Sequence, residues 1–301
     1  MKIKVASRGS KLSIKQVEIF ENYIKRFMPD LEMEKIIVKT KGDIIHDKPL
    51  YEIGEKGIFE KEVNNIVIND NADIAIHSMK DLPKDIDPKL DIIMVLPREI
   101  PNDSLVFTNK KINSIGDIPD SSIIGTSSIR RASFILHYNN KVKIKPIRGN
   151  IDTRLKKLYN NEYDFIIMAE AGLIRLNLNP NRIILPLDQF PPEPNQGIIA
   201  VVGKKGDKIS DILSKYSDKN TYYEAVAERE FLKEAQAGCH SPIGAVARLH
   251  NNMITLIAAI ASRNGKKMYL LRFKDYKENA SKLGQEAGNI IYELIERVSN
   301  S

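Results

Sequence analysis

The sequence predicts an α/β protein made of two similar lobes and a smaller third unit at the C-terminus. Its 301 residues exceed the usual size of a single hydrophobic core. Short apolar segments alternate with segments of helical period through most of the chain, which is typical of strands followed by covering helices. The sequence of strand, turn and helix that begins at residue 5 recurs from residue 123, which indicates a repeated lobe.

Composition limits the classes of function. Apolar residues make up 42% and charged residues 28%, as in ordinary globular proteins. No apolar run approaches 18 residues, and the N-terminus turns polar early, so we expect a cytoplasmic chain with no membrane partner. The net charge of +7 allows a polyanionic partner. Tryptophan is absent and most arginines stand singly in turns, which favours discrete carboxylate or phosphate contacts over nucleic acid.

The first lobe is expected to open with a strand at 3–6 and a helix at 11–27. Ser10 is a natural N-cap because its hydroxyl can accept from an unpaired backbone N–H. A second strand follows at 34–39. Segment 40–57 contains three glycines, a proline and alternating charges without a sustained period. Such a long loop is usually functional or disordered, so we expect it either to close over a charged ligand or to form a surface excursion.

A helix at 58–69 and an apolar strand at 72–76 lead into the turn at 77–83. Ligands of open α/β sheets bind beyond the carboxyl ends of strands, so Lys80 and Asp81 lie where chemistry is expected. A Lys–Asp pair in a turn is also a common surface ion pair, and this alternative stays open.

The second lobe is expected to repeat these parts. A strand at 90–96 is expected to close the first lobe, and the elements expected beyond the boundary at residue 97 are strands at 104–107, 123–125 and 142–147 and a helix at 130–138. Segment 162–173 aligns with 71–82 at equal length, although with few identities. The shared pattern predicts two similar lobes that face one cleft.

Five arginines of the second lobe follow strands or lie in the first turns of helices. They are Arg130, Arg131, Arg148, Arg154 and Arg175. A single arginine is usually a solvated surface charge. Helix N-termini add unpaired N–H groups and partial positive charge, so Ser127 and Ser128 would join the arginines in binding anions. The mutual repulsion of the five leads us to expect a compensating polyanion.

The proline-rich segment 186–194 is expected to return the chain to the first lobe, with a buried strand at 197–202. A helix at 222–235, a hairpin across 245–261 and a closing helix at 278–298 would form the third unit. The expected domains are therefore 1–97 with 197–216, then 98–196, and finally 217–301.

The chain has one cysteine, Cys239, on a segment crowded with glycine and proline. One thiol makes no intrachain disulfide and is too few for a cysteine-built metal site, and we expect no metal. It is either a small buried filler or an accessible, reactive thiol on a turn. The residues alone leave these two interpretations even.

Six ordered motifs resemble the porphobilinogen deaminase (hydroxymethylbilane synthase) family. They are VASRGS at 5–10, ADIAIHSMKDLP at 72–83, GTSSIRR at 125–131, RGNIDTRL at 148–155, AGLIRL at 171–176 and GCHSPIG at 238–244. The resemblance implies two periplasmic-binding-protein-like lobes plus a small C-terminal α/β domain. It also implies a monomeric transferase of porphyrin and heme biosynthesis, which condenses four porphobilinogen molecules head to tail into hydroxymethylbilane and releases ammonia.

The resemblance further implies a covalent dipyrromethane cofactor, bound through a thioether to Cys239, which favours the functional interpretation of the thiol. Asp81 matches the family's central catalytic carboxylate. Lys80 matches a lysine that contacts the cofactor, and segment 40–57 matches a flexible lid.

The remaining implied site residues fall into two sets. Those that match cofactor-binding residues are Thr126, Ser127, Ser128, Arg130 and Arg131. Those that match residues steering substrate and the growing chain are Arg8, Ser10, Gln16, Arg148, Arg154 and Arg175. Each pyrrole carries an acetate and a propionate, so the growing chain would supply the negative charge that the arginines require.

Four residues depart from the family pattern, and one of them is Ala237, which precedes Gly238 where glycine is common. Glu170 places an acid near the expected pocket, while Glu193 and Asn195 replace small residues before Gln196-Gly197. These departures affect the affinity of the expected pocket for its ligand and the geometry of the segment that returns the chain to the first lobe. The alternative function is a two-lobed anion-binding or sensory protein without chemistry, which would need neither Asp81 nor a presented thiol.

Overall fold

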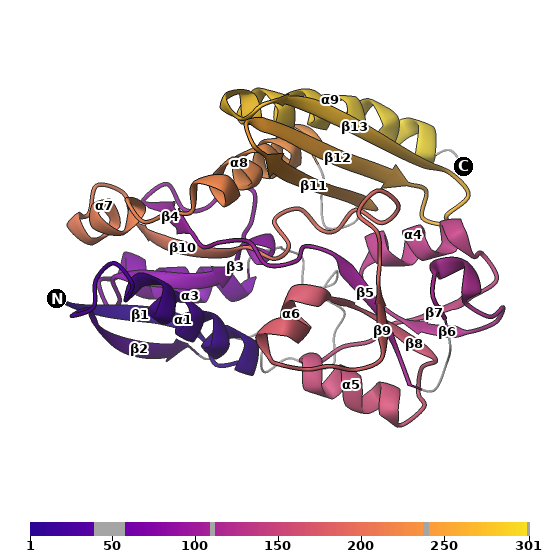
Figure 1. Cartoon of the computed structure of the whole chain (residues 1–301), viewed down its shortest axis with the longest axis horizontal. Coiled ribbons are helices and arrows are strands. Elements are labelled where there is room, and N and C mark those ends of the chain that lie inside the picture. The colour runs from indigo at the N-terminus through magenta and orange to yellow at the C-terminus, as the bar shows by residue number, and fades with distance from the viewer. Residues whose placement is uncertain (39–57, 109–111, 237–240, 300–301) are drawn as a thin grey trace. The chain divides into compact units, whose positions relative to one another are not determined.

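The computed structural model describes residues 1–38, 58–108, 112–236 and 241–299, and it confirms the α/β fold class (Figure 1). The chain separates into two compact units. The first unit contains Met1–Glu99 and Gly197–Tyr222, and the second contains Ile100–Gln196 and Tyr223–Ser301. The first holds one five-stranded sheet, and the second holds another five-stranded sheet together with a three-stranded one.

The first sheet has the strand order β2-β1-β3-β10-β4. Its strands are β1 (Lys2–Arg8), β2 (Glu32–Val38), β3 (Ile74–Ser78), β4 (Leu90–Val95) and β10 (Ile199–Lys204). Strand β1 is parallel to β2 and β3, whereas β10 is antiparallel to β3 and β4. The predicted return of the chain to the first lobe is therefore confirmed.

Three α-helices accompany this sheet in the described chain: α1 (Lys11–Ile24), α3 (Ile58–Ile68) and α7 (Lys208–Ser214). Ser10 caps α1 as predicted, since its Oγ accepts a hydrogen bond from Ser13 N at 3.2 Å. Phe20 and Ile24 of α1 pack against Ile3 and Ile74 of the sheet. Burial of these apolar side chains fixes the helix on the sheet and so sets where the ends of β1 and β3 lie.

The second sheet has the order β7-β6-β8-β5-β9. Its strands are β5 (Asp103–Phe107), β6 (Ile123–Gly125), β7 (Lys143–Lys145), β8 (Phe165–Ala169) and β9 (Arg182–Ile184). Here β6 is parallel to β7 and β8, and β5 is antiparallel to β8 and β9. In each lobe the antiparallel strand follows a crossing from the other lobe, so the predicted similarity of the two lobes extends to their topology.

The helices of the second lobe are α4 (Ile129–Tyr138), α5 (Ile151–Tyr159) and α6 (Glu170–Arg175). The C-terminal part contains α8 (Lys219–Glu234), β11 (Ile243–His250), β12 (Met253–Ala261), β13 (Met268–Tyr276) and α9 (Ala280–Ser299). The predicted hairpin is β11–β12. Strand β13 was not predicted, although Leu271 and Phe273, which pack toward the core, alternate with exposed Arg272 and Lys274.

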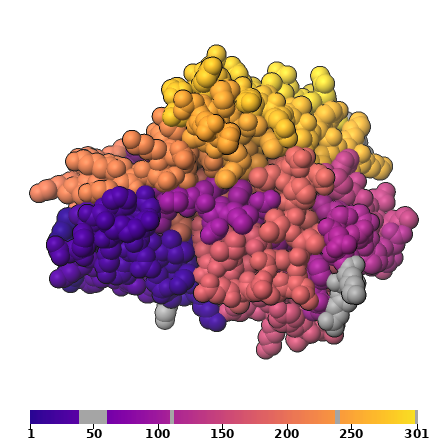
Figure 2. Space-filling view, viewed as in Figure 1, coloured from indigo at the N-terminus to yellow at the C-terminus, as the bar shows by residue number. Residues whose placement is uncertain are grey.

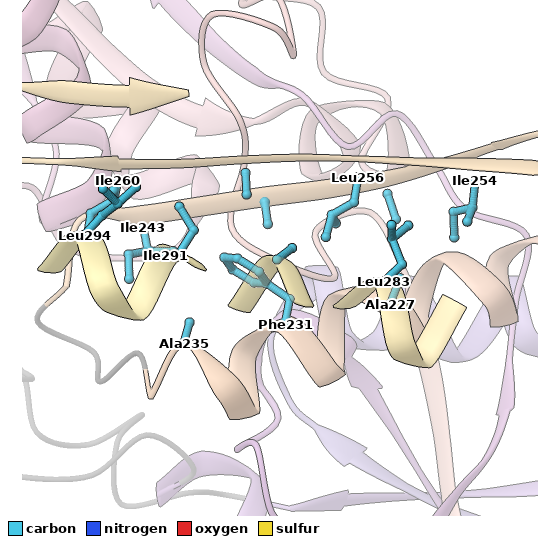
Figure 3. Close-up of a cluster of buried hydrophobic side chains, with 14 of the residues drawn as sticks. Ala227, Phe231, Ala235, Ile243, Ile254, Leu256, Ile260, Leu283, Ile291 and Leu294 are labelled. Atoms are coloured by element: carbon cyan, nitrogen blue, oxygen red, sulfur yellow. The ribbon is translucent and has the colours of Figure 1, made fainter. Parts of the chain in front are cut away.

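The C-terminal sheet is covered on both faces within the second unit. Figure 3 shows Phe231 of α8 and Leu283 of α9 gathered against Leu256 of β12. On the opposite face, Ala259 and Ala261 of β12 join the core of the second lobe. Figure 2 accordingly shows the C-terminal residues, in yellow, packed directly on that lobe. The described helices include none with the length and apolar character to cross a membrane.

Strand β11 packs directly against the proline-rich segment 186–194, which leads from the second lobe back to the first. Ala245 N donates a hydrogen bond to Pro192 O at 2.9 Å. A Cβ at Gly244 would stand 2.3 Å from Pro191 O, so only glycine permits this approach. This contact ties the start of β11, which follows residues 237–240 in sequence, to the second lobe.

Candidate active site

The carboxyl end of β3 presents the predicted catalytic turn. Strand β3 is followed by a 3-10 helix, Met79–Asp81. Met79 and Leu82 are buried, and Met79 N donates to Ile198 O at 3.0 Å, which anchors the turn beside β10. Lys80 is half-buried and Asp81 is exposed to solvent. The structure thus displays the Asp81 carboxylate at a sheet edge, on a turn held by apolar anchors.

Other predicted residues lie at the same edge of the first sheet. Arg8 ends β1, and β1 runs parallel to β3 with Ala6 opposite Ala75. Gln16 of α1 is buried, and its Nε2 donates to Ser78 Oγ at 2.7 Å, next to the turn. Ser10 begins α1 at this edge. Because the carboxyl ends of parallel strands share one edge, the fold brings Arg8, Ser10, Gln16, Lys80 and Asp81 together.

His77, the last buried residue before this turn, is held as a neutral imidazole. Its Nε2 donates to Asn64 Oδ1 of α3 at 2.8 Å. Burial, reinforced by the positive charge of Arg8, lowers the pKa of His77 to about 3. Protonation would place a charge at a buried position, so the neutral form is the one that the fold accepts.

We expect His77 to make the protein less stable as the pH falls. The unfolded chain protonates His77 near pH 6.5, whereas the folded chain does so only near pH 3. Between these values the unfolded state binds one more proton, so the free energy of unfolding should fall by about 1.4 kcal/mol per pH unit from this residue. Above pH 6.5 His77 is neutral in both the folded and the unfolded chain, so the protein keeps its full stability there.

The measurement is urea unfolding of the unchanged protein and His77→Gln between pH 7.5 and 4.5. The variant should lose less stability across this range, because glutamine carries no titrating group. His250→Gln, which removes an exposed histidine, is the control. Equal pH slopes for His77→Gln and the unchanged protein would contradict the prediction.

In the second lobe, the N-terminus of α4 gathers the predicted anion-binding residues. Ser128 is the N-cap, and its Oγ accepts from Arg131 N at 3.4 Å. Thr126 Oγ1 accepts from Ser128 N at 3.1 Å, and Ser127 Oγ donates to Ile147 O at 2.8 Å. The Ser127 side chain is exposed. Hydroxyls and backbone N–H groups at a helix N-terminus are suited to bind carboxylates.

Arg130 and Arg131 turn inward and share one buried carboxylate, Asp103 of β5. Arg130 Nη2 lies 2.7 Å from Asp103 Oδ2, and Arg131 Nη2 lies 2.6 Å from Asp103 Oδ1. These two guanidinium groups hold the pKa of the Asp103 carboxyl well below its usual range, against the opposing effect of burial. For this pair the protein itself supplies compensating charge, where the sequence led us to expect only a bound polyanion.

The other three arginines follow the ends of neighbouring strands. Arg148 comes after β7 and is half-buried, and Arg154 of α5 donates from Nε to Gly149 O at 2.8 Å. Arg175 ends α6, directly after β8, and is buried. Since β6, β7 and β8 are parallel neighbours, these residues belong to the same edge of the sheet as Thr126.

The acid at Glu170 is neutralised inside the lobe. Its side chain is 1% exposed and receives two 2.8 Å hydrogen bonds, from Arg182 Nε and Nη2. Ser104 Oγ donates to the same carboxylate. A bidentate arginine and a hydroxyl satisfy the buried charge, so Glu170 adds little negative potential to its surroundings.

The two departures in the crossing segment have distinct structural consequences. Asn195 has φ 66°, in the left-handed region where glycine is favoured and asparagine is the side chain tolerated best. Glu193 Oε2 lies 3.7 Å from Arg130 Nε, and its side chain is 28% exposed. The first departure therefore preserves the backbone, while the second brings a partly exposed acid to Arg130.

Cys239 and segment 40–57 lie outside the described residues. The described residues nevertheless fit an acidic organic group in their donor chemistry. Arg130 Nε is buried without a hydrogen-bond partner in the described part of the chain, and the nearby Glu193 carboxylate is too distant for one. Together with the backbone N–H groups at the N-terminus of α4, this donor therefore suits a carboxylate.

Sequence comparisons match almost the whole chain. The family model "Porphobilinogen deaminase, dipyromethane cofactor binding domain" matches residues 3–212, and "Porphobilinogen deaminase, C-terminal domain" matches residues 222–293. A relative from Hyperthermus butylicus named probable porphobilinogen deaminase is 47% identical over 95% of each chain. One of the same name from Pyrobaculum neutrophilum is 42% identical, over 99% of this chain and 100% of its own. Substrate binding domain 2 of Lactococcus lactis GlnP aligns with 71% of this chain and 85% of its own, at 13% identity and a TM-score of 0.43.

Proposed function

The chain belongs to the porphobilinogen deaminase family, and we propose which of its residues carry the family's reaction. The enzyme is a transferase that condenses porphobilinogen head to tail into hydroxymethylbilane, with release of ammonia. One observation carries this function: both domains of the family are matched in order, over nearly the full chain. A sensory or purely anion-binding protein is not favoured, because the match includes the domain that follows the two lobes.

Asp81 is the proposed catalytic carboxylate. Loss of ammonia from the aminomethyl arm of porphobilinogen leaves a cationic methylene-pyrrolenine, and each coupling produces a protonated pyrrole. An exposed carboxylate on a turn with buried anchors can accept pyrrole N–H hydrogen bonds and stabilise this positive charge. Lys80, its neighbour on the turn, is proposed to contact the cofactor.

The arginines are proposed to bind the acetate and propionate groups. Cofactor carboxylates would be held at the start of α4, by Thr126, Ser127, Ser128, Arg130 and Arg131. Substrate and growing chain would be steered by Arg8, Ser10, Gln16, Arg148, Arg154 and Arg175. These assignments follow the strand-end positions described above, where forked guanidinium groups suit planar carboxylates.

The matched domain binds dipyrromethane, which supplies an acceptor pyrrole that remains attached to the protein. We propose Cys239 as its thioether attachment point, because it is the only thiol in the chain. Segment 40–57 is proposed to act as the lid of the site. We further propose a cytoplasmic monomer that binds no nucleic acid, divided into 1–97 with 197–216, 98–196, and 217–301.

The direct test is turnover of porphobilinogen by the purified chain. Ammonia and hydroxymethylbilane should appear in a ratio of four to one, with one linear tetrapyrrole per four substrate molecules. The Asp85→Asn variant, which alters an exposed carboxylate near the turn, should give the same ratio and rate. Binding of porphobilinogen without release of ammonia would instead indicate the binding-protein alternative.

A further inference from the structure

Asp103 is a fully buried carboxylate to which no role has yet been given. It is the first residue of β5, and its side chain is 0% exposed. It lies between Arg130 and Arg131, whose side chains are themselves almost entirely buried. An ionised carboxylate at such a site is tolerated only when charged partners and hydrogen bonds satisfy it.

The contacts of Asp103 fix the direction of both guanidinium groups. Oδ1 accepts from Arg131 Nε at 3.1 Å and from Arg131 Nη2 at 2.6 Å, while Oδ2 accepts from Arg130 Nη2 at 2.7 Å. Each arginine also donates from Nη1 to a backbone carbonyl: Arg130 to Pro191 O at 2.9 Å and Arg131 to Ile167 O at 3.1 Å. Arg131 is held along its Nε–Nη2 edge by the carboxylate, and Arg130 is held at Nη2 by the carboxylate and at Nη1 by a carbonyl, so both planar groups can rotate little.

Asp103 is in turn held by Gln196. The Gln196 side chain is buried, and its Nε2 donates to Asp103 Oδ1 at 2.9 Å and to Pro101 O at 2.7 Å. The amide therefore links the start of β5 to the residues that follow segment 186–194. Gln196 therefore holds Asp103 in place, and Asp103 holds the two arginines in place.

Charge balance gives Asp103 a second effect. Two positive charges in close proximity in a water-poor interior repel each other strongly. One shared carboxylate removes most of this repulsion, and the partly exposed Glu193 carboxylate, 3.7 Å from Arg130 Nε, adds a second negative charge at the rim. Arg130 Nε makes no hydrogen bond among the described residues, and its ion pair with Glu193 is long enough to leave this donor for a ligand carboxylate.

We propose that Asp103 is a positioning residue, which orients Arg130 and Arg131 to receive the carboxylates of the cofactor. The proposal rests on the cofactor-binding function assigned above to these two arginines. Asp103 itself is too deeply enclosed to touch the cofactor, so it acts only through the arginines. Gln196 supports the same arrangement more weakly, since its loss leaves the charges in place.

The test measures cofactor occupancy by intact mass in protein purified from cells, for the unchanged chain and for Asp103→Asn. In the folded variant we expect the fraction with two added pyrrole units to fall at least about tenfold, equivalent to about 1.4 kcal/mol. The KM for porphobilinogen, measured on the loaded fraction, should also rise. A structural role alone would lower the melting temperature and leave occupancy and KM unchanged.

Glu224→Gln is the matched control. Glu224 is a buried carboxylate of the same unit, which accepts from Arg248 Nη1 at 3.3 Å and from Leu249 N at 3.0 Å. The Glu224→Gln variant should have a lower melting temperature than the unchanged protein and the same cofactor occupancy. Occupancy of Asp103→Asn equal to that of Glu224→Gln would overturn the proposal.

Gln196→Ala keeps the test decisive if Asp103→Asn does not fold. This variant retains all three charges, so we expect a smaller drop in occupancy, about threefold, since a single hydrogen bond is weaker than an ion pair. With Asp103→Asn unfolded, unchanged occupancy and KM in Gln196→Ala would refute the positioning role. Absence of added mass in the unchanged protein would instead contradict the proposed function.

Discussion

Replacing Asp81 by asparagine is expected to reduce kcat by about a thousandfold, which makes it the most damaging single change to the chemistry. The amide keeps the shape of the side chain but removes the negative charge that stabilises the cationic pyrroles. Because Asp81 is exposed, the melting temperature should hardly change. Rates should be measured per cofactor-loaded molecule, with loading determined by intact mass.

Asp81→Glu separates charge from position. Glutamate keeps the negative charge but displaces it by about one carbon–carbon bond, and a misplacement of about 1 Å can cost about a hundredfold in rate. We therefore expect its kcat to lie between those of the unchanged enzyme and Asp81→Asn. If Asp81→Asn turned over as fast as the Asp85→Asn control, Asp81 could not be the catalytic carboxylate.

The Cys239→Ser variant is expected to be inactive and to have the mass of its sequence alone. The unchanged protein, purified from cells, should be heavier by two linked pyrrole units. A thiol forms a nucleophilic thiolate near neutral pH, whereas a serine hydroxyl without an activating base does not, so attachment should fail. Intact-mass spectrometry of the two proteins, purified in parallel, makes the comparison.

Ser241→Ala tests whether the effect belongs to the sulfur. This substitution changes another residue of the segment that connects α8 to β11. It leaves the Cys239 thiol unchanged, so the added mass should persist. An active Cys239→Ser protein without added mass would defeat the assignment of the attachment point.

Local patterns predicted much of the fold. The cap at Ser10 follows from a side chain that satisfies a helix N-terminus, and the structure contains it. The apolar run before His77 predicted β3 and placed Asp81 beyond its end. In each case residues within a few positions of each other contain the physical cause. Strand β13 was missed although its residues from 271 onward alternate between half-buried and exposed, because none of them is fully buried and the apolar signal is therefore small.

The buried ionic partners could not be predicted in this way. Asp103 meets Arg130 across 27 residues of sequence and Gln196 across 93, while Glu170 meets Arg182 across 12. No local period reports such pairs, because a charge is neutralised by whatever the fold brings within a few ångströms. The departure at Glu170 could be read from the sequence, but its compensation by Arg182 could not.

The sequence by itself determined the family, the α/β class, most of the strands and helices, and the strand ends at which the candidate residues would lie. The hydrophobic period and the capping residues act over short stretches of sequence, and each motif is contiguous. All three can therefore be recognised from the sequence alone. Only the tertiary structure decided that Arg130 and Arg131 share Asp103 and that His77 stays neutral. Desolvation and charge pairing depend on packing in three dimensions, and burial makes them strong enough to set the direction and charge of these side chains.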